Sequence, residues 1–340
     1  MTWPQALALA RRPFWSDADH RLRLLWRMVG FGVLIILLER AASAAGLRLD
    51  PGEILRGSAP ALRLSLIALA VLFAACLAAV RLLDRRSVRE LGIVPGPRFG
   101  GDLAFGLMVG AATMTLVFAI EYALGWARIT AVAYTRAGEA FGPALLRMIG
   151  VFACVALYEE TASRGYLLRT MAQGFAGRRV PAPWALAIAT LVSSAFFALG
   201  HVNNPGASVV STANILCAGV VLALPYVITG RLAASIGFHA TWNFFQSTVY
   251  GFATSGVPPV ASAFLVAQEG PPAWTGGAFG PEAGILGLVG FLLGGAALVL
   301  RERWRSGSVT ACAALVTGER PSLTAATPGS PSGSPATPAS

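Results

Sequence analysis

The sequence contains no lysine. All 26 basic residues are arginine, and charged residues of both signs make up only 12% of the 340-residue chain. The absence of lysine excludes a Ser–Lys dyad and every other mechanism that needs a lysine base. The low charge excludes an ordinary water-soluble domain, which needs more charged residues to cover its surface.

Several motifs of membrane proteases are also absent. The chain has no HExxH, which excludes a zinc protease of the site-two type, and no GxSG in an apolar run, which a rhomboid would need. A presenilin-type site needs two aspartates within the membrane, whereas Asp102 stands alone at the start of an apolar run. The four cysteines form no CxxC pair, and we expect Cys76, Cys154 and Cys217, which lie in apolar runs, to be inert buried thiols.

Long apolar runs dominate the rest of the chain. The mean hydropathy is +0.65, and runs of about twenty residues, the length that crosses a bilayer, recur along it. They are continuous and lack the alternation of a β-barrel, so they predict helices. We expect an all-α, polytopic bundle of about eight spans, at 22–38, 62–83, 103–124, 143–168, 183–201, 207–229, 232–252 and 284–300.

The arginines orient this bundle. They lie between the apolar runs instead of forming one basic surface, so the net charge of +10 indicates contact with lipid headgroups and not nucleic acid. Four arginine-rich segments fall on one side if there are eight spans: the N-terminus and the loops after spans two, four and eight. Cytosolic loops are enriched in arginine, which predicts that both termini are cytosolic. The Ala- and Arg-rich composition favours a bacterial plasma membrane.

Polarity divides the chain into four parts. We expect spans one to three with a cytosolic N-terminus over 1–142, a catalytic core of spans four to seven over 143–252, and a loop with the last span over 253–306. The fourth part is a Pro/Ser/Thr/Ala-rich tail over 307–340. Its portion from Gly318 onward cannot bury a core and is expected to be disordered.

Ionisable residues inside a span are candidates for function, and here they concentrate in the core. Span four contains Glu159, Glu160 and Arg164, span five ends at His201, and span seven contains His239 and Asn243. Residues four apart share a helix face, so Glu160 can pair with Arg164 and His239 can act beside Asn243. Glu159 points about 100° away from Glu160 and is left for another neighbour. Phe197, one turn before His201, is expected to pack beside it.

A carboxylate, two imidazoles and an amide are typical of a hydrolytic site. Glu159 would take a proton from water as general base, and Asn243 would donate to the developing oxyanion. His201 and His239 would either hydrogen-bond the water directly or hold a metal ion, with zinc as the candidate. The expected partners are a polypeptide substrate at or in the membrane and the lipid bilayer.

The motifs EExxxR, FxxxH and HxxxN, in this order on successive spans, resemble those of the CPBP family of CAAX prenyl endopeptidases. The resemblance covers about residues 143–252. It implies eight helices and an intramembrane site open to the cytosol, with Glu159, His201, His239 and Asn243 as site residues and Glu160 and Arg164 as their neighbours. We lean towards a metal-independent mechanism. This sequence departs from the family between Glu160 and Arg164, where small residues replace the usual bulky apolar ones.

Two questions remain open at this stage. At 1.5 Å per residue, Glu159 lies about 14 Å from the cytosolic end of span four, whereas His201 lies about 27 Å along span five. Either span five is steeply tilted, or it begins outside the bilayer and the turn 202–206 is buried in protein. The alternative function is a non-enzymatic membrane protein, such as an immunity factor, a scaffold or a transporter, that uses the same polar cluster.

Overall fold

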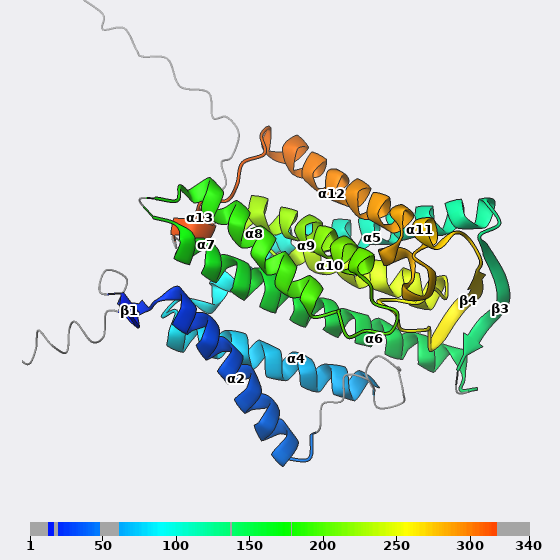
Figure 1. Ribbon diagram of the computed structural model, residues 1–340, viewed down its shortest axis with the longest axis horizontal. Helices are drawn as coiled ribbons and strands as arrows, with labels where there is room; N and C mark the ends of the chain where they lie inside the picture. The colour runs from blue at the N-terminus through cyan, green and yellow to red at the C-terminus, as the bar shows by residue number, and fades with distance from the viewer. Residues whose placement is uncertain (1–12, 17–19, 48–60, 137, 178, 318–340) are drawn as a thin grey trace, which may run out of the picture.

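The computed structural model describes residues 13–16, 20–47, 61–136, 138–177 and 179–317. These residues form a bundle of long helices that run roughly along the long axis of the molecule (Figure 1). The helical elements are, in chain order, α2 (Leu24–Ala44), α4 (Ala61–Ala78), η1 (Ala79–Leu83), η2 (Val88–Leu91), α5 (Pro97–Ala123), α6 (Phe141–Glu160), η3 (Thr161–Leu168), α7 (Arg169–Phe175), α8 (Ala182–Leu199), α9 (Val209–Thr229), α10 (Ala233–Phe244), η4 (Phe245–Val249), α11 (Pro272–Thr275), η5 (Gly277–Phe279), η6 (Pro281–Ala283), α12 (Ile285–Ser306) and α13 (Ala314–Thr317).

Six helices of the described part of the chain are long and apolar enough to cross a membrane. They are Leu62–Leu83, Pro97–Ala123, Phe141–Phe175, Ala182–Leu199, Val209–Thr229 and Ile285–Ser306. The expected polytopic helical membrane protein is thereby confirmed. The first and seventh predicted spans correspond to α2, which contains Arg27, Glu39 and Arg40, and to α10 with η4, which together cover only 233–249.

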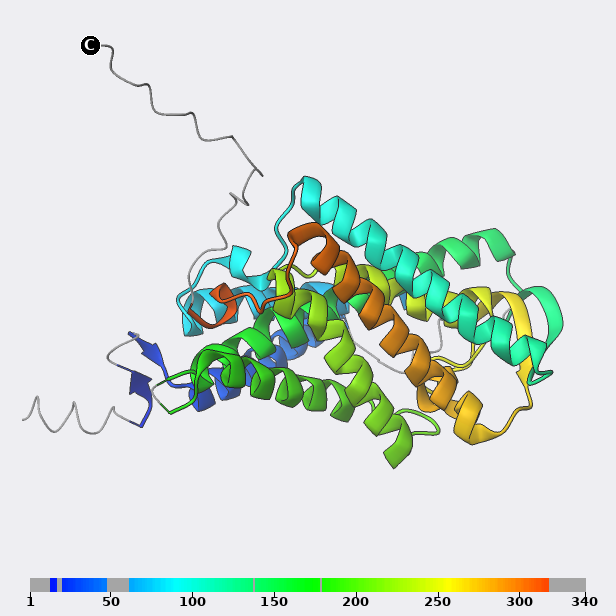
Figure 2. The same ribbon diagram turned by 90° about the horizontal axis from the view of Figure 1, so that it is seen from above.

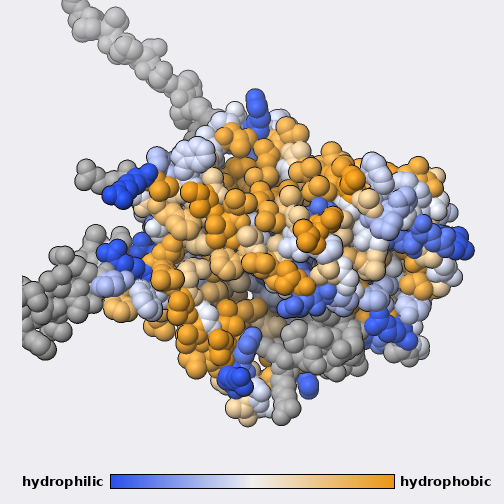
Figure 3. Space-filling view, in the orientation of Figure 1, coloured by the Kyte–Doolittle hydropathy of each residue, from blue (hydrophilic) through white to orange (hydrophobic). Residues whose placement is uncertain are grey.

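The surface agrees with insertion in a bilayer. Large apolar side chains are exposed around the bundle, among them Leu146, Leu191 and Leu292. In Figure 3 hydrophobic residues cover the middle of the visible face, and hydrophilic residues gather towards its ends. An exposed apolar surface of this extent indicates contact with lipid.

Glycines bring α5 and α10 unusually close together. A Cβ added at Gly106 would lie 2.2 Å from the carbonyl oxygen of Ala234, and one added at Gly237 would lie 2.5 Å from that of Leu103. Small residues allow such backbone approach between membrane helices. The contact fixes α10, which carries His239 and Asn243, against the longest helix of the bundle that precedes the catalytic core.

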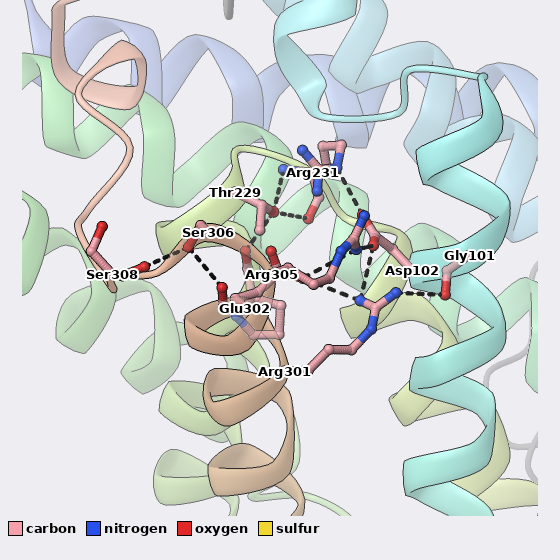
Figure 4. Close-up of polar contacts among 10 residues, drawn as sticks. Gly101, Asp102, Thr229, Arg231, Arg301, Glu302, Arg305, Ser306 and Ser308 are labelled. Carbon is pink, nitrogen blue, oxygen red and sulfur yellow. Dashed lines mark hydrogen bonds and ion pairs between the residues drawn. The ribbon is translucent and has the colours of Figure 1, made fainter. Parts of the chain in front are cut away.

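Arginine–carboxylate clusters hold one end of the bundle together. Asp102, at the start of α5, accepts from Arg231 at 2.8 Å, from Arg301 at 2.9 Å and from Arg305 at 2.8 Å, which joins α5 to the end of α12 (Figure 4). Asp84 accepts from Arg27 at 2.6 Å in the same part of the molecule. A buried carboxylate needs such partners, so Asp102 has a structural role.

The opposite end carries an antiparallel sheet of β3 (Ala127–Thr135) and β4 (Ala261–Gln268), two segments far apart in the sequence (Figures 1 and 2). The register pairs Ala127 with Gln268 and Thr135 with Ala261. A second, two-residue pair joins β1 (Trp15–Ser16) to β2 (Arg21–Leu22). The predicted helical bundle is thus supplemented by two small sheets in the connecting segments.

The predicted tail begins later than expected. Residues 307–311 are exposed, but the chain then packs against the bundle: Leu315 of α13 is fully buried, and the backbone N–H of Cys312 donates to the carbonyl of Val227 at 2.8 Å. Arg169 also donates to the carbonyl of Ala314 at 3.0 Å. The portion from Gly318 onward lies outside the described residues.

Candidate active site

A change of helix type occurs directly after the two glutamates. Glu159 and Glu160 are the last residues of α6, and the chain continues without a break as the π-helix η3 and then α7. The whole run, Phe141–Phe175, has 35 residues. π-helical turns are rare and occur often at functional sites, because they redirect side chains that a regular helix would place differently.

The ion pair expected between Glu160 and Arg164 is present. Nη1 of Arg164 donates to Oε1 of Glu160 at 2.9 Å, and both side chains are almost completely buried. Nη2 of Arg164 donates to the backbone carbonyl of Gly219 at 2.8 Å, which ties η3 to α9. The two charges offset each other in an apolar setting where either alone would be very costly.

His239 of α10 contacts both glutamates. Its Nδ1 lies 2.9 Å from Oε1 of Glu160, and its Nε2 lies 3.7 Å from Oε2 of Glu159. Because a carboxylate oxygen accepts, the short contact makes Nδ1 the donor. One histidine ring is therefore held by the buried carboxylate and directed towards the other.

Phe197 of α8 packs its ring against the cluster formed by Glu160, Arg164 and His239. The guanidinium carbon of Arg164 lies 4.5 Å from the centroid of the Phe197 ring, a cation–π distance. The expected packing of Phe197 beside His201 is also present, with the two ring centroids 4.9 Å apart. The centroid of the His239 ring lies 6.0 Å from that of Phe197. Nδ1 of His201 donates to the carbonyl of Phe197 at 2.8 Å.

A cavity of about 100 Å³ brings three of the predicted residues together. Glu159, His201 and Asn243 all line it, and His239 lies behind Glu159. The rest of the wall is mostly apolar on the α6 side and mixed elsewhere: Met148, Val151, Phe152, Val155, Tyr158, Asn204, Ser247, Thr254, Ser255, Val257, Pro258 and Val260. At about 30 Å³ per water molecule, the cavity has room for a few waters.

A comparison with protein families identifies the segment that holds this cluster. The family model described as type II CAAX prenyl endopeptidase Rce1-like matches residues 141–245. Residues 141–245 form an Rce1-like domain. The expected relationship to CAAX proteases is thereby confirmed, and it supports a peptidase in a multi-pass membrane protein. No curated protein and no solved structure matches the chain.

The Rce1-like domain contains every residue predicted for the site, but not the whole wall of the cavity. Thr254, Ser255, Val257, Pro258 and Val260 follow the domain in sequence and lead into β4. These residues have no motif of their own in the sequence. The strand β4 fixes their position. Its partner strand β3 precedes the domain in the sequence.

Glu282 is a buried carboxylate near the site that the motifs did not indicate. It lies in η6, and its Oε2 accepts from the backbone N–H of Ser255 at 2.7 Å and from the Ser255 hydroxyl at 2.9 Å. Burial raises the pKa of Glu282, and the two bonds from Ser255 oppose that shift. Ser255 has a φ of +47°, which is rare for a residue with a side chain, and its carbonyl accepts from Asn204 at 3.0 Å. Glu282 thus holds a strained turn of the cavity wall.

The depth mismatch of His201 disappears because the helical run that contains Glu159 is longer than expected. Glu159 lies sixteen residues before the end of that run, or about 24 Å, and not about 14 Å. His201 lies just beyond the end of α8, and both residues line one cavity. Of the two alternatives for span five, the one with a buried turn at 202–206 is contradicted, because Val202 and Asn203 are exposed.

The residues that the structure describes include no group of three His, Cys, Asp or Glu side chains placed to hold a metal ion. A catalytic zinc usually takes three protein ligands. The candidate pair His201 and His239 supplies only two such ligands. Nδ1 of His201 is engaged with Phe197 and Nδ1 of His239 with Glu160, which leaves Nε2 of each ring for another contact. No step below is derived through zinc.

Proposed function

We propose that this protein is an intramembrane endopeptidase that hydrolyses a peptide bond of a membrane-associated or CAAX-like polypeptide, with Glu159 as general base. The observation that carries the proposal is the single cavity that Glu159, His201 and Asn243 share. Of the two adjacent glutamates, Glu160 is sealed and its side chain is 0% exposed, whereas the Glu159 side chain is 23% exposed and borders the cavity.

The hydrogen bond of His201 supports a position for the attacking water between His201 and Glu159. Because Nδ1 of His201 donates to a carbonyl, Nε2 of the neutral ring is an acceptor. The carboxylate of Glu159 is an acceptor as well. A water molecule between them donates both hydrogens and presents a lone pair to the substrate carbonyl. Glu159 then takes a proton from this water as the C–O bond forms.

Asn243 and His239 are suited to stabilise the oxyanion. The amide of Asn243 is a donor at the cavity wall, and His239 is fixed by Glu160 with its Nε2 towards Glu159. The carboxylates of Glu159 and Glu160 and the guanidinium of Arg164 together carry one net negative charge. A protonated His239 balances it. Prearranged donors in a site with little water stabilise a developing oxyanion strongly. Glu159 finally returns the proton to the departing amine as the C–N bond breaks.

Cleavage by the reconstituted protein tests the proposal. Wild type and Glu159→Gln are inserted in liposomes and incubated with a fluorogenic peptide that carries a lipid anchor. General acid–base catalysis contributes about 10²–10⁴-fold, so Glu159→Gln should lose at least a hundredfold in rate. Glu269→Gln is the matched control, because Glu269 is an exposed carboxylate paired with Arg128 outside the site.

Two results would count against this function. Equal rates of cleavage by wild type and Glu159→Gln would exclude Glu159 as the general base. Absence of cleavage, together with a cellular phenotype that Glu159→Gln leaves intact, would favour the alternative of a non-enzymatic membrane protein. A transporter would use the same cluster for ion or proton binding at mid-depth.

A further inference from the structure

The arginine-rich end of the bundle and the cavity lie in different halves of the molecule. We propose that the substrate reaches the cavity from the extracytoplasmic face, so that the enzyme cleaves polypeptides presented outside the cytosol. That a substrate enters this cavity rests on the proposed function. The position of the cavity in the molecule does not depend on that function. It differs from the cytosolic opening that the family resemblance implies.

The first step is the identity of the cytosolic end. Arginines of the described residues gather where α2, α5 and α7 begin and where η1, α9 and α12 end, on the side of α7 and α13 in Figure 1. They are Arg23, Arg27, Arg81, Arg85, Arg86, Arg89, Arg98, Arg169, Arg179, Arg231, Arg301, Arg303 and Arg305. The opposite ends of the helices have fewer: Arg40 near the end of α2, Arg63 near the start of α4, and Arg128, Arg136 and Arg147 at the ends of α5 and α6 beside the sheet β3–β4. The positive-inside rule therefore places the α7 end in the cytosol and the sheet outside.

The second step is the direction of the cavity. Its α6 wall runs from Glu159 back to Met148, eleven residues or about 16 Å towards the end of α6 that lies beside the sheet. Its remaining walls are the turn after α8, the later half of α10 with η4, and the segment 254–260 before β4. Every one of these pieces lies in the half of the bundle that carries the sheet.

The third step is that the cytosolic end is packed and bonded. Arg169, which is 1% exposed, pairs with Glu90 at 2.9 Å, and Asp84 and Asp102 are almost completely buried under their arginines. A substrate entering from this end would have to break several buried ion pairs. At the other end, Pro258 is exposed and also lines the cavity, so the segment 254–260 reaches from the surface to the site.

The side chains that line the cavity restrict the class of substrate that can enter it. The entry wall offers Val257, Pro258 and Val260 on one side and Val151 and Val155 on the other, with no charged side chain before Glu159. A polypeptide segment with small or apolar residues at the scissile bond fits this passage. A prenylated C-terminus on the cytosolic leaflet would approach the wrong end.

Single-cysteine labelling tests the sidedness without any need for activity. In a background with Cys76, Cys154, Cys217 and Cys312 replaced by Ala, Pro258→Cys marks the cavity rim and Ser308→Cys marks the arginine-rich end. The protein is produced in a bacterial plasma membrane, and spheroplasts are treated with a membrane-impermeant maleimide. Pro258→Cys should react in intact spheroplasts, and Ser308→Cys only after permeabilisation. The reverse pattern would overturn the inference. If the background fails to fold, Thr130→Cys on β3 and Arg303→Cys in the wild-type chain give the same comparison against the wild-type signal.

An activity measurement separates this inference from the proposed function. The lipid-anchored peptide is added either to spheroplasts or to inverted vesicles. Cleavage that depends on Glu159 should occur at least tenfold faster in spheroplasts. Cleavage that depends on Glu159 only in inverted vesicles would overturn the sidedness and leave the peptidase intact. If Pro258→Cys and Ser308→Cys are labelled as expected but no cleavage that depends on Glu159 occurs on either side, the proposed peptidase function and its polypeptide substrate would be overturned. The extracytoplasmic position of the cavity would stand.

Discussion

Nδ1 of His239 lies 2.9 Å from Oε1 of Glu160, and this contact separates the roles of two glutamates that are adjacent in the sequence. Glu160 is bonded to His239 and Arg164 and is fully buried, so it is committed to structure. Glu159 faces the cavity and meets the same histidine only through the longer contact of 3.7 Å. The histidine thus connects a structural ion pair to the carboxylate that we propose as the base.

The two glutamates should therefore respond differently to the same substitution. Glu160→Gln leaves Arg164 as a buried charge without its counter-ion, and breaking a buried pair in this way costs about 3–5 kcal/mol. We expect a clear fall in the thermal unfolding temperature in detergent, whereas Glu159→Gln should unfold close to wild type. The double variant Glu160→Gln/Arg164→Met should recover part of the loss. Equal unfolding temperatures for Glu160→Gln and wild type would contradict the structural role of this pair.

Phe197 should affect the rate through the residues that it positions. Phe197→Leu keeps an apolar side chain but removes the ring that contacts Arg164 and His201. A cation–π contact contributes about 0.5–2 kcal/mol, so we expect up to an order of magnitude loss in kcat with little change in KM. Phe196→Leu is the matched control, because Phe196 is 52% exposed on the same helix. An equal effect of the two changes would remove the positioning role of Phe197.

The sequence predicts those parts of the site that depend on local helix geometry. Glu160 and Arg164 are four residues apart, and their pairing follows from the period of a helix. Phe197 and His201 share the same spacing, and their rings are in contact. Long apolar runs likewise indicate the membrane spans, because their length and composition are set by the bilayer.

The parts that depend on distant segments escape such reasoning. Glu282 and Ser255 are 27 residues apart, and their contact depends on how the loops after η4 fold over the bundle. The sheet β3–β4 joins segments more than a hundred residues apart, and β-pairing of that kind has no short-range signal. The length of the run Phe141–Phe175 also escaped prediction, because Arg169 suggested an end near 168, whereas its side chain is buried and paired with Glu90.

Glu282 should make stability depend on pH. Its pKa in the folded protein is raised by burial, so the folded state holds the proton to higher pH than the unfolded state. The stability that it contributes is full below the usual carboxyl pKa and is lost as pH rises through the raised value. We expect the unfolding temperature to fall over this window in wild type and to fall less in Glu282→Gln, which still accepts from Ser255. Identical pH profiles of wild type and Glu282→Gln would exclude this role.

Removal of metal should leave the activity unchanged. The residues that the structure describes place no third His, Cys, Asp or Glu side chain with His201 and His239 to complete a metal site, and we propose that the water is held between Glu159 and His201, which line one cavity. Incubation with 1,10-phenanthroline or EDTA should therefore not lower the rate of cleavage that depends on Glu159. The metal content of the purified protein is measured in parallel. A loss of rate that added zinc restores would show that the histidines serve as metal ligands instead.

Two glycines of α5 should respond to alanine with opposite signs. Gly100 has open space around a new Cβ, and replacing a helical glycine by alanine in such a place stabilises by about 0.5–1 kcal/mol. A Cβ at Gly106 would instead lie 2.2 Å from the backbone carbonyl of Ala234, which cannot move without shifting α10. Gly106→Ala should therefore lower the unfolding temperature and also reduce cleavage, because α10 carries His239 and Asn243. Gly100→Ala should raise the unfolding temperature slightly and leave cleavage unchanged. Equal behaviour of the two variants would mean that the close approach of α5 and α10 does not determine where the catalytic helix lies.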